Sequence, residues 1–268
     1  MTERILVTGA TGTVGPHVVA GLADRDVAVR SAVRDPESAP AEIADADETV
    51  AFDFAKPETW GDALADVDGV FLMRPPGVSE AAVTSFAEAA ARVGVDRVAY
   101  LSTLGADRNI LIPHHRIEKR LAESDLSHTL LRASFFMQNL GEVHRADVVE
   151  RDEIFVPAGG GETSFVDARD VGEAAAVVLT ESGHAGRAYD ITGPEALDYD
   201  AVAAVFSDVL KRPITYPNPS LAAFARIPMI ATSFAHRWMN SVMISSPNVS
   251  TPRCVFLRAS RFGSTRME

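Results

Sequence analysis

Three glycines near the amino terminus have the spacing of a phosphate-binding turn. Gly9, Gly12 and Gly15 directly follow the apolar residues 4–8 and open a segment with helical periodicity. In such a turn the first glycine allows a tight bend, the second lets the backbone approach a pyrophosphate, and the third allows close packing of helix on strand. The pyrophosphate then lies at the positive end of the helix. The pattern predicts a dinucleotide site, lined also by the intervening residues Thr11, Thr13 and Val14.

An arginine follows the second apolar segment, at the place where dinucleotide-binding proteins distinguish their two cofactors. Residues 27–34, VAVRSAVR, end at Arg34. An acidic side chain at this place hydrogen-bonds the ribose 2′-hydroxyl of NAD, whereas an arginine accommodates the 2′-phosphate of NADP. Arg34 could therefore bind a 2′-phosphate, and the alternative is a solvated arginine at a strand end. Arg30 is on the same strand but is expected to point elsewhere.

Apolar segments alternate with amphipathic helices along most of the chain. Strands are expected at residues 4–8, 27–34, 49–54, 68–73, 97–103, 128–134 and 187–193. Helices are expected after the glycine turn, over 79–94 with Ser79 as N-cap, over 116–124, from 167–170 onward and over 198–212. Residues 154–166 predict two short strands around a glycine turn. Such alternation indicates an α/β fold, a Rossmann-type doubly wound parallel sheet with a small C-terminal substrate lobe.

The chain is expected to form a single NAD(P)-binding domain over residues 1–268. Its Rossmann core would comprise about 1–155 plus 163–192, and its smaller lobe about 135–162 and 193–268. Beyond Asp208 the next carboxylate side chain is Glu268, and helical periodicity is poor from about residue 225. Two explanations stay open for this tail: a shifted reading frame from about residue 225, or a divergent lobe.

Composition excludes several classes of protein. The 268 residues are 47% hydrophobic and 23% charged, as in a globular protein, and contain no apolar run of about 18 residues that would predict a membrane span. A net charge of −12 argues against nucleic acid as a partner. Cys254 is the only cysteine, so no internal disulfide can form, which fits the cytoplasm. The histidines have no metal-ligand spacing, so no metal site is expected.

Several motifs together resemble one family. VTGATGTVGPHVV (7–19) is similar to the short-chain dehydrogenase/reductase superfamily in its extended or atypical branch. VRDPE, FDF and above all residues 117–140, IEKRLAESDLSHTLLRASFFMQNL, resemble the NmrA-like subgroup of that branch, of the quinone oxidoreductase type 2 kind, with Asp125 where a glycine is usual. The resemblance covers about residues 3–225. The family includes NAD(P)H-dependent quinone reductases and also redox-sensing regulators with little or no turnover.

The resemblance favours the 2′-phosphate role for Arg34, and hence NADP(H) over NAD(H). It also implies further binding residues. Asp53 matches the position that contacts the adenine amino group, and Phe54 follows it. Met73, Arg74 and Pro75, after the fourth strand, would line the nicotinamide ribose. The run RASFFMQNL supplies the candidates for the substrate pocket, Phe135, Phe136 and Asn139.

The catalytic residues depend on the register of residues 109–123. In the extended branch a Tyr and a Lys are four apart, and a Glu follows the Lys by four. If Glu118 is that Glu, His114 takes the place of the Lys and Ile110 that of the Tyr. Helical geometry agrees, because His114 and Glu118 share a face with the apolar Ile117 and Leu121. The similar spacing of His115 and Lys119 is on another face and is interpreted as accidental.

The usual proton donor is therefore missing, since an isoleucine cannot ionise. Ser102 and Thr103 keep the hydroxyl position near the nicotinamide. His114 could hold the ribose hydroxyls, donate a proton to a reduced carbonyl, or be a packed histidine with one hydrogen bond.

Two functions stay open. The first is an oxidoreductase that reduces a quinone or similar small electrophile with NAD(P)H. The second is a non-enzymatic sensor that binds NAD(P) and reports redox state to a regulatory partner. The aromatic pocket residues favour the first function, whereas the missing Tyr and Lys favour the second. A sugar-nucleotide epimerase is disfavoured because its chemistry uses the Tyr. The partner is expected to be a small molecule and not a nucleic acid or a membrane, and a homodimer is possible.

Overall fold

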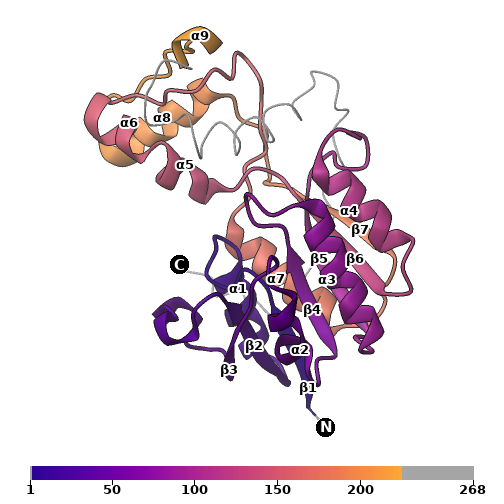
Figure 1. Cartoon of the computed structure of the whole chain (residues 1–268). Helices are drawn as coiled ribbons and strands as arrows, with labels where there is room; N and C mark the ends of the chain where they lie inside the picture. The colour runs from indigo at the N-terminus through magenta and orange to yellow at the C-terminus, as the bar shows by residue number, and fades with distance from the viewer. Residues whose placement is uncertain (1, 225–268) are drawn as a thin grey trace, which may run out of the picture.

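The computed structural model describes residues 2–224, and residues 1 and 225–268 lie outside the described part. Both explanations for the tail concern residues 225–268 and therefore lie outside the described residues. The centre of the molecule is a sheet of seven parallel strands in the order β3-β2-β1-β4-β5-β6-β7 (Figure 1). The strands are β1 (Glu3–Val7), β2 (Val27–Val33), β3 (Glu48–Ala51), β4 (Gly69–Met73), β5 (Arg97–Thr103), β6 (Ser127–Ala133) and β7 (Arg187–Ile191).

The seven strands expected for the sheet are present, and the parallel Rossmann-type sheet is confirmed. The third strand is shorter than expected, because the chain turns at Asp53. There the Asp53 side chain accepts a hydrogen bond from the Ala55 amide at 2.9 Å, and the Asp53 carbonyl accepts one from the Lys56 amide at 3.0 Å. The strand therefore ends before Asp53.

Helices cover both faces of the sheet, and each face has its own hydrophobic core. One face carries α1 (Gly15–Ala23) and α7 (Ala168–Thr180), and the other carries α2 (Trp60–Leu64), α3 (Glu80–Arg92) and α4 (Pro113–Ala122) (Figure 1). Successive strand residues alternate between the two cores: Phe71 packs with α1 and α7, whereas Val70 and Leu72 pack on the other side. Short 3₁₀ turns connect these elements, η1 (Pro36–Ser38), η2 (Ala41–Ile43) and η3 (Pro57–Thr59).

Polar residues start the helices where the sequence predicts. The Ser79 hydroxyl accepts a hydrogen bond from the Ala82 amide at 3.2 Å, so Ser79 is the N-cap of α3. Asp167 begins α7 in the same way, by accepting from the Arg169 amide at 2.8 Å. These caps satisfy amides that have no partner inside their helices.

Residues after β6 and after β7 form a smaller lobe beyond the carboxyl ends of the strands (Figure 1). Its helices are α5 (Met137–Val143), α6 (Arg145–Arg151), α8 (Tyr199–Leu210) and α9 (Leu221–Phe224). They enclose a third core, to which Val148, Ile154, Phe165, Tyr199 and Val202 contribute.

The two short strands expected within residues 154–166 are wrong. Within this segment the structure has isolated bridges in place of strands, including Thr163 with Leu197 and Val166 with Phe136. The Ile154 amide donates to the Thr215 carbonyl at 2.9 Å. The segment therefore pairs with separate, distant parts of the chain, and no two of its own residues form a ladder.

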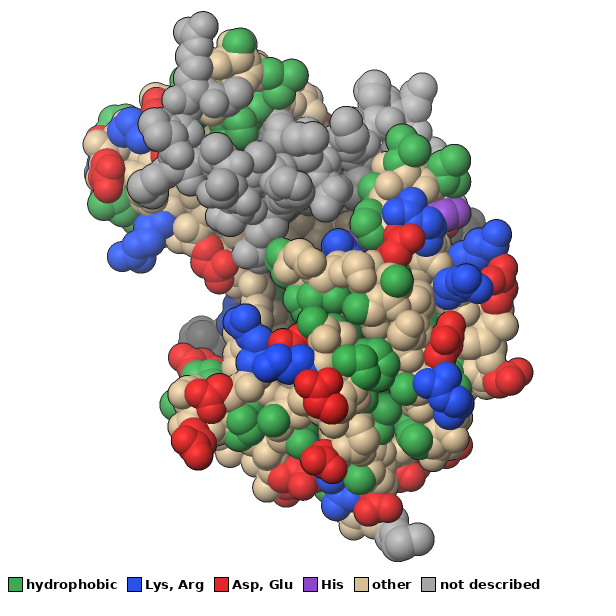
Figure 2. Space-filling model, in the orientation of Figure 1, with side chains coloured by type: hydrophobic (Ala, Val, Ile, Leu, Met, Phe, Trp, Pro, Cys, Tyr) green, Lys and Arg blue, Asp and Glu red, His purple; other side chains and the backbone are tan. Residues whose placement is uncertain are grey.

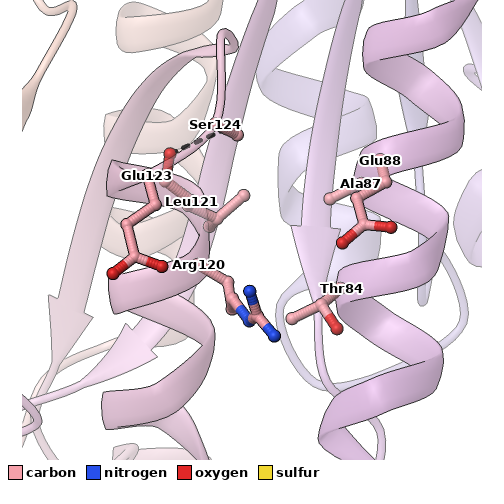
Figure 3. Close-up of a pocket in the computed structure, with 7 residues that line it drawn as sticks. All are labelled: Thr84, Ala87, Glu88, Arg120, Leu121, Glu123 and Ser124. Atoms are coloured by element: carbon pink, nitrogen blue, oxygen red, sulfur yellow. Dashed lines mark hydrogen bonds between the residues drawn. The ribbon is translucent and has the colours of Figure 1, made fainter.

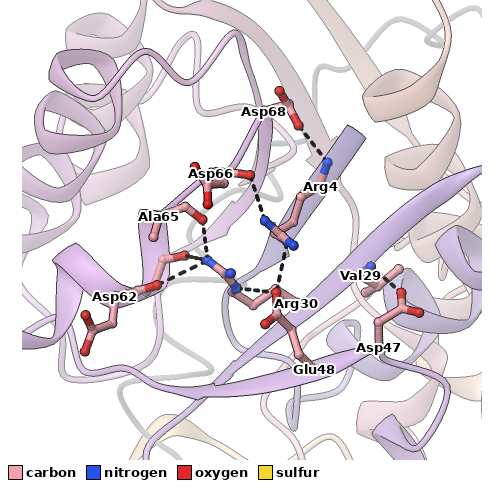
Figure 4. A network of polar contacts seen from close by, with 10 residues as sticks. Arg4, Val29, Arg30, Asp47, Glu48, Asp62, Ala65, Asp66 and Asp68 are labelled. Atoms are coloured by element: carbon pink, nitrogen blue, oxygen red, sulfur yellow. Dashed lines mark hydrogen bonds and ion pairs between the residues drawn. The ribbon is translucent and has the colours of Figure 1, made fainter. Parts of the chain in front are cut away.

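A buried arginine joins β2, β3 and the end of α2 (Figure 4). The Arg30 guanidinium donates to the Glu48 carboxylate at 2.6 Å and to the carbonyls of Asp62, Ala63 and Ala65 at 3.1, 3.0 and 2.7 Å. It thereby supplies the donors that the carbonyls at the end of a helix lack. Arg4 extends the network through an ion pair with the same Glu48 carboxylate at 3.0 Å. Arg30 points towards Glu48 and the end of α2 and not towards the glycine turn, as expected from the sequence.

Candidate cofactor and active site

The glycine turn has the backbone that close approach to a ligand requires. Gly9 has a φ of +64°, in the left-handed region that favours glycine, and its carbonyl accepts from the Gly12 amide at 3.0 Å. A Cβ on Gly15 would lie 2.2 Å from the Gly9 carbonyl oxygen, so a larger residue cannot fit there. The helix therefore begins directly against the turn, as predicted from the glycine spacing.

Several donors around the turn remain available. Within the described residues, the amides of Thr11, Thr13 and Val14 have no acceptor, and no side chain caps α1. Thr11 is exposed and Thr13 is half-buried, whereas the Val14 side chain packs in the core, so Val14 can contribute only its amide. Free amides at a helix N-terminus bind anions. The turn therefore fits the pyrophosphate of a dinucleotide.

A threonine without a predicted role, Thr8, holds the turn against β4. The buried Thr8 hydroxyl donates to the Phe71 carbonyl at 2.9 Å and accepts from the Met73 amide at 3.1 Å. Because Thr8 is the last residue before Gly9, these bonds fix the turn relative to the residues after β4. A threonine directly before the glycine motif was the available sequence signal.

Arg34 is free to bind a ligand. Its side chain is exposed at the end of β2 and has neither a hydrogen bond nor an ion pair with any described residue. The neighbouring Asp35 is engaged, because its carboxylate accepts from the Glu37 amide at 3.1 Å and the Ser38 hydroxyl at 2.8 Å. At the end of β2 the Arg34 guanidinium is therefore available to a ligand, whereas the Asp35 carboxylate is occupied by local hydrogen bonds.

Asp53 and Phe54 lie beyond the end of β3. The half-buried Asp53 uses one carboxylate oxygen to hold the local turn, which leaves the other oxygen without a partner among residues 2–224. The Phe54 side chain packs edge-to-face with Phe52 and Phe86, with ring centroids 4.8 and 5.5 Å apart. Any contact of Phe54 with a cofactor would therefore be made by its backbone.

The segment after β4 lies beside the glycine turn. Met73, Arg74 and Pro75 are all half-buried, and a Cβ on Gly9 would come within 2.6 Å of the Met73 sulfur. The Nε atom of Arg74 is enclosed and has no hydrogen-bond partner among the described residues. An unpaired buried guanidinium nitrogen is costly unless a ligand satisfies it. Arg74 is therefore suited to contact a bound molecule.

His114 forms a pair with Tyr100, a residue that was not predicted from the sequence to belong to the site. Tyr100, on β5, is fully buried, and its hydroxyl lies 2.8 Å from Nδ1 of His114 at the start of α4. Burial and then the charge of Arg74 lower the pKa of His114 to about 4, and burial raises the pKa of Tyr100 well above its usual value. Both side chains are therefore neutral near pH 7. Tyr100 and His114 are 14 residues apart in the sequence, a spacing that matches no motif, so the pair could not be predicted from the sequence.

Ser102 is engaged in a second contact between β5 and α4. Its buried hydroxyl donates to the Glu118 carboxylate at 2.5 Å. Arg132, on β6, donates to both oxygens of the same carboxylate, from Nε at 3.1 and 3.2 Å and from a terminal nitrogen at 2.7 Å. The Ser102 hydroxyl proton is therefore directed at Glu118 in this structure, and the predicted role of Ser102 beside the nicotinamide stays a prediction. Thr103, half-buried at the end of β5, has no side-chain partner among the described residues.

The other residues of the 109–123 stretch are arranged as the helical register implies. His115 bonds to the Ala106 carbonyl at 2.8 Å, and the exposed Lys119 lies 3.9 Å from Glu123. Neither side chain reaches Tyr100 or His114, so the Tyr-Lys-like spacing of His115 and Lys119 has no common site. Ile110 is 67% exposed.

The three substrate-pocket candidates lie where the lobe meets the sheet. Phe135 packs edge-to-face on Phe165 of the lobe, and Phe136 packs against the core beneath α1 and α7. The Oδ1 atom of Asn139 is enclosed and unpaired within residues 2–224. The surface is indented between the lobe and the sheet-bearing part, and basic side chains lie on the latter side of the indentation (Figure 2).

A separate hollow of about 200 Å³ lies between α3 and α4, lined by Thr84, Ala87, Glu88, Arg120, Leu121, Glu123 and Ser124 (Figure 3). It contains none of the predicted site residues and is not the candidate site. Among the described residues, no group of three or more His, Cys, Asp or Glu side chains could hold a metal ion. No helix of residues 2–224 is both long and apolar enough to cross a membrane.

Comparison with known proteins places the chain in a family. Residues 1–243 match the NmrA-like family. The chain belongs to the NmrA-like family. It is 34% identical over 217 residues to the NAD(P)H azoreductase of Xenophilus azovorans, covering 79% of this chain and 76% of that protein. It is 32% identical over 232 residues to quinone oxidoreductase 2 of Escherichia coli, covering 82% and 79% respectively.

Solved structures of two NADP(H)-binding reductases have the same fold as this chain. The NADPH complex of the Escherichia coli NADPH-dependent quinone oxidoreductase matches with a TM-score of 0.76 and 28% identity over 90% of each chain. Citrobacter sp. triphenylmethane reductase complexed with NADP(H) matches with a TM-score of 0.75 and 25% identity over 92% of each chain. The NmrA-like resemblance and the Rossmann-type fold are confirmed, and the chain is an oxidoreductase of the NAD(P)H-dependent kind.

Proposed function

We propose that this NmrA-like protein uses NADPH to reduce a quinone or a similar small electrophile. The observation that carries the proposal is the hydrogen-bonded Tyr100–His114 pair, on which the charge of Arg74 acts from the segment beside the glycine turn. These groups can stabilise negative charge that develops on a substrate as it accepts a hydride. The named activities of the azoreductase and quinone oxidoreductase relatives support the same class of reaction.

The chain's own residues would hold the cofactor in an extended arrangement. The pyrophosphate would accept from the amides of the glycine turn at the start of α1, and the free carboxylate oxygen of Asp53 would accept from the adenine amino group. Arg34 would pair with the 2′-phosphate, because a guanidinium fork matches phosphate geometry. Met73, Arg74 and Pro75 would line the nicotinamide ribose. A nicotinamide in its reduced form supplies the hydride when bound.

His114 and Arg74 would act on the substrate oxygen. Addition of a hydride gives a quinone two electrons and one hydrogen, and leaves one oxygen anionic. The neutral imidazole donates an N–H to that oxygen, and the Arg74 charge stabilises it. One proton from water then completes the hydroquinone. Because His114 has a pKa of about 4, it serves as a hydrogen-bond donor at pH 7 and not as an imidazolium acid.

The aromatic residues at the junction of lobe and sheet would receive the substrate ring. Phe135 and Phe136 are half-buried, so part of each ring is already desolvated and part remains accessible. Aromatic rings prefer offset-stacked or edge-to-face contacts. The enclosed, unpaired Oδ1 of Asn139 could accept a hydrogen bond from a hydroxyl group of the product.

The direct test is loss of NADPH absorbance in the presence of a panel of quinones and azo compounds. Wild-type protein should consume NADPH with at least one of them, and His114→Ala should lower kcat by about 10²–10³-fold, as removal of one oxyanion donor does. His115→Ala is the matched control, since His115 bonds to Ala106 and should leave kcat within about twofold. NADPH binding without turnover of any compound would favour the redox-sensor function instead.

Cofactor preference has its own test. Arg34→Ala should weaken NADPH binding by about tenfold or more, the value of a charge-assisted pair with the 2′-phosphate, and leave NADH binding nearly unchanged. Arg92→Ala removes the same charge from the exposed end of α3 and should affect neither cofactor. Equal loss of affinity for both cofactors in Arg34→Ala would refute the assignment.

A further inference from the structure

The pairing of Tyr100 with His114 has a consequence for which nitrogen of the imidazole carries the proton. The Tyr100 hydroxyl has Nδ1 of His114 as its only partner among residues 2–224, at 2.8 Å. The two rings come from different elements, β5 and the first turn of α4, and their centroids are 5.8 Å apart. The contact is therefore built by the tertiary fold.

The hydroxyl proton must point at the imidazole. If Nδ1 were protonated and donated to the phenol oxygen, the buried hydroxyl proton would have no acceptor among the described residues. An unpaired buried donor is costly, so this arrangement is disfavoured. The hydroxyl therefore donates to an unprotonated Nδ1, and the single proton of the neutral ring is on Nε2.

Nε2 is the nitrogen left for a ligand. It has no hydrogen-bond partner among the described residues, and it is not among the enclosed, unpaired atoms. The nearby charges also favour the neutral ring. Arg74 acts on His114 from the end of β4, and the negative charge of Glu118, one turn along α4, is matched by Arg132.

We propose that Tyr100 is a positioning residue: its hydroxyl holds His114 in the Nε2–H tautomer, so that Nε2–H is the donor presented to the substrate oxygen. This inference rests on the proposed function for the identity of the acceptor, but not for the tautomer itself. A ring free to exchange tautomers would present a lone pair at Nε2 for part of the time, and a lone pair repels a developing oxyanion.

The test is the tautomer of His114, read from the ¹⁵N shifts of histidine-labelled protein, together with steady-state kinetics of Tyr100→Phe. This variant removes one oxygen and keeps the ring. We expect wild-type His114 to show an unprotonated Nδ1 and a protonated Nε2, and Tyr100→Phe to show a mixture. Turnover should fall about 3- to 10-fold, the range of one neutral hydrogen bond, with the Kd for NADPH unchanged within twofold.

The chain contains a matched control. The Tyr189 hydroxyl lies 2.8 Å from Nδ1 of His184, so Tyr189→Phe breaks a second tyrosine–histidine pair that contains none of the site residues. It should change the spectrum of His184 and leave both the His114 tautomer and turnover as in wild type.

Three outcomes would overturn the proposal. A protonated Nδ1 on wild-type His114 would do so even if Tyr100→Phe failed to fold. An unchanged His114 tautomer in a folded Tyr100→Phe would show that the hydroxyl does not select it. A changed tautomer with unchanged turnover would show that the tautomer does not matter to the reaction. Failure of the proposed function is distinguishable, since it would appear as no turnover in wild type with the expected His114 spectrum.

Discussion

Glu118→Ala should destabilise the protein strongly, because it removes the carboxylate that bonds Arg132 bidentately. Glu118 is 6% exposed, and it accepts from Arg132 and from Ser102. Breaking a buried ion pair on one side typically costs about 3–5 kcal/mol, since the remaining charge loses its partner. Asp107 lies 3.8 Å from Arg132 and would compensate in part. We therefore expect about 3 kcal/mol, more than about 100-fold in the ratio of folded to unfolded protein.

Urea denaturation followed by circular dichroism measures this free energy. Glu123→Ala is the matched control on the same helix: its exposed pair with Lys119 spans 3.9 Å and should contribute no more than about 0.5 kcal/mol. Replacing both Glu118 and Arg132 by methionine should recover much of the loss, because apolar residues of similar volume leave no unpaired charge.

Two results would refute this reasoning. The first is a cost below about 1 kcal/mol for Glu118→Ala, a value expected of a surface pair. The second is a double methionine variant no more stable than Glu118→Ala, which would show that the loss comes from packing and not from the uncompensated guanidinium.

Three further predictions concern the turn, the arginine network and pH. Gly15→Ala should destabilise the protein by about 1–3 kcal/mol and weaken NADPH binding, because its Cβ would lie 2.2 Å from the Gly9 oxygen; thermal unfolding and fluorescence titration would check both effects. Arg30→Ala should cost about 2 kcal/mol in urea, since it strips donors from the carbonyls at the end of α2, and a cost near zero would contradict the network. Since His114 has a folded pKa of about 4, below its unfolded value of about 6.5, its unprotonated form contributes stability that is fully present above pH 6.5 and is lost as the pH falls towards 4. Urea midpoints of wild type should decline more steeply over that range than those of His114→Asn, and parallel curves would contradict the lowered pKa.

The sequence alone determined the features that depend on local spacing. Three glycines after an apolar strand predicted the turn that the structure contains, because the need for φ above zero and for close packing follows from a few consecutive residues. Hydrophobic periodicity predicted the seven strands of the sheet. The alternation of strands with helices predicted that the strands are parallel. Helical geometry separated His114 and Glu118 from His115 and Lys119, since residues four apart share a face.

Only the tertiary structure decided which of these side chains meet. The distance between Tyr100 and His114 depends on how α4 crosses β5, and no spacing along the chain encodes it. The same crossing brings the Ser102 hydroxyl to Glu118, a contact that no spacing along the chain predicts. Residues 154–166 looked like strands because their apolar pattern is local, yet a strand requires a neighbouring ladder, and their partners are scattered along the chain. Hydrogen-bond partners far apart in sequence are selected by packing, so they become visible only in the folded protein.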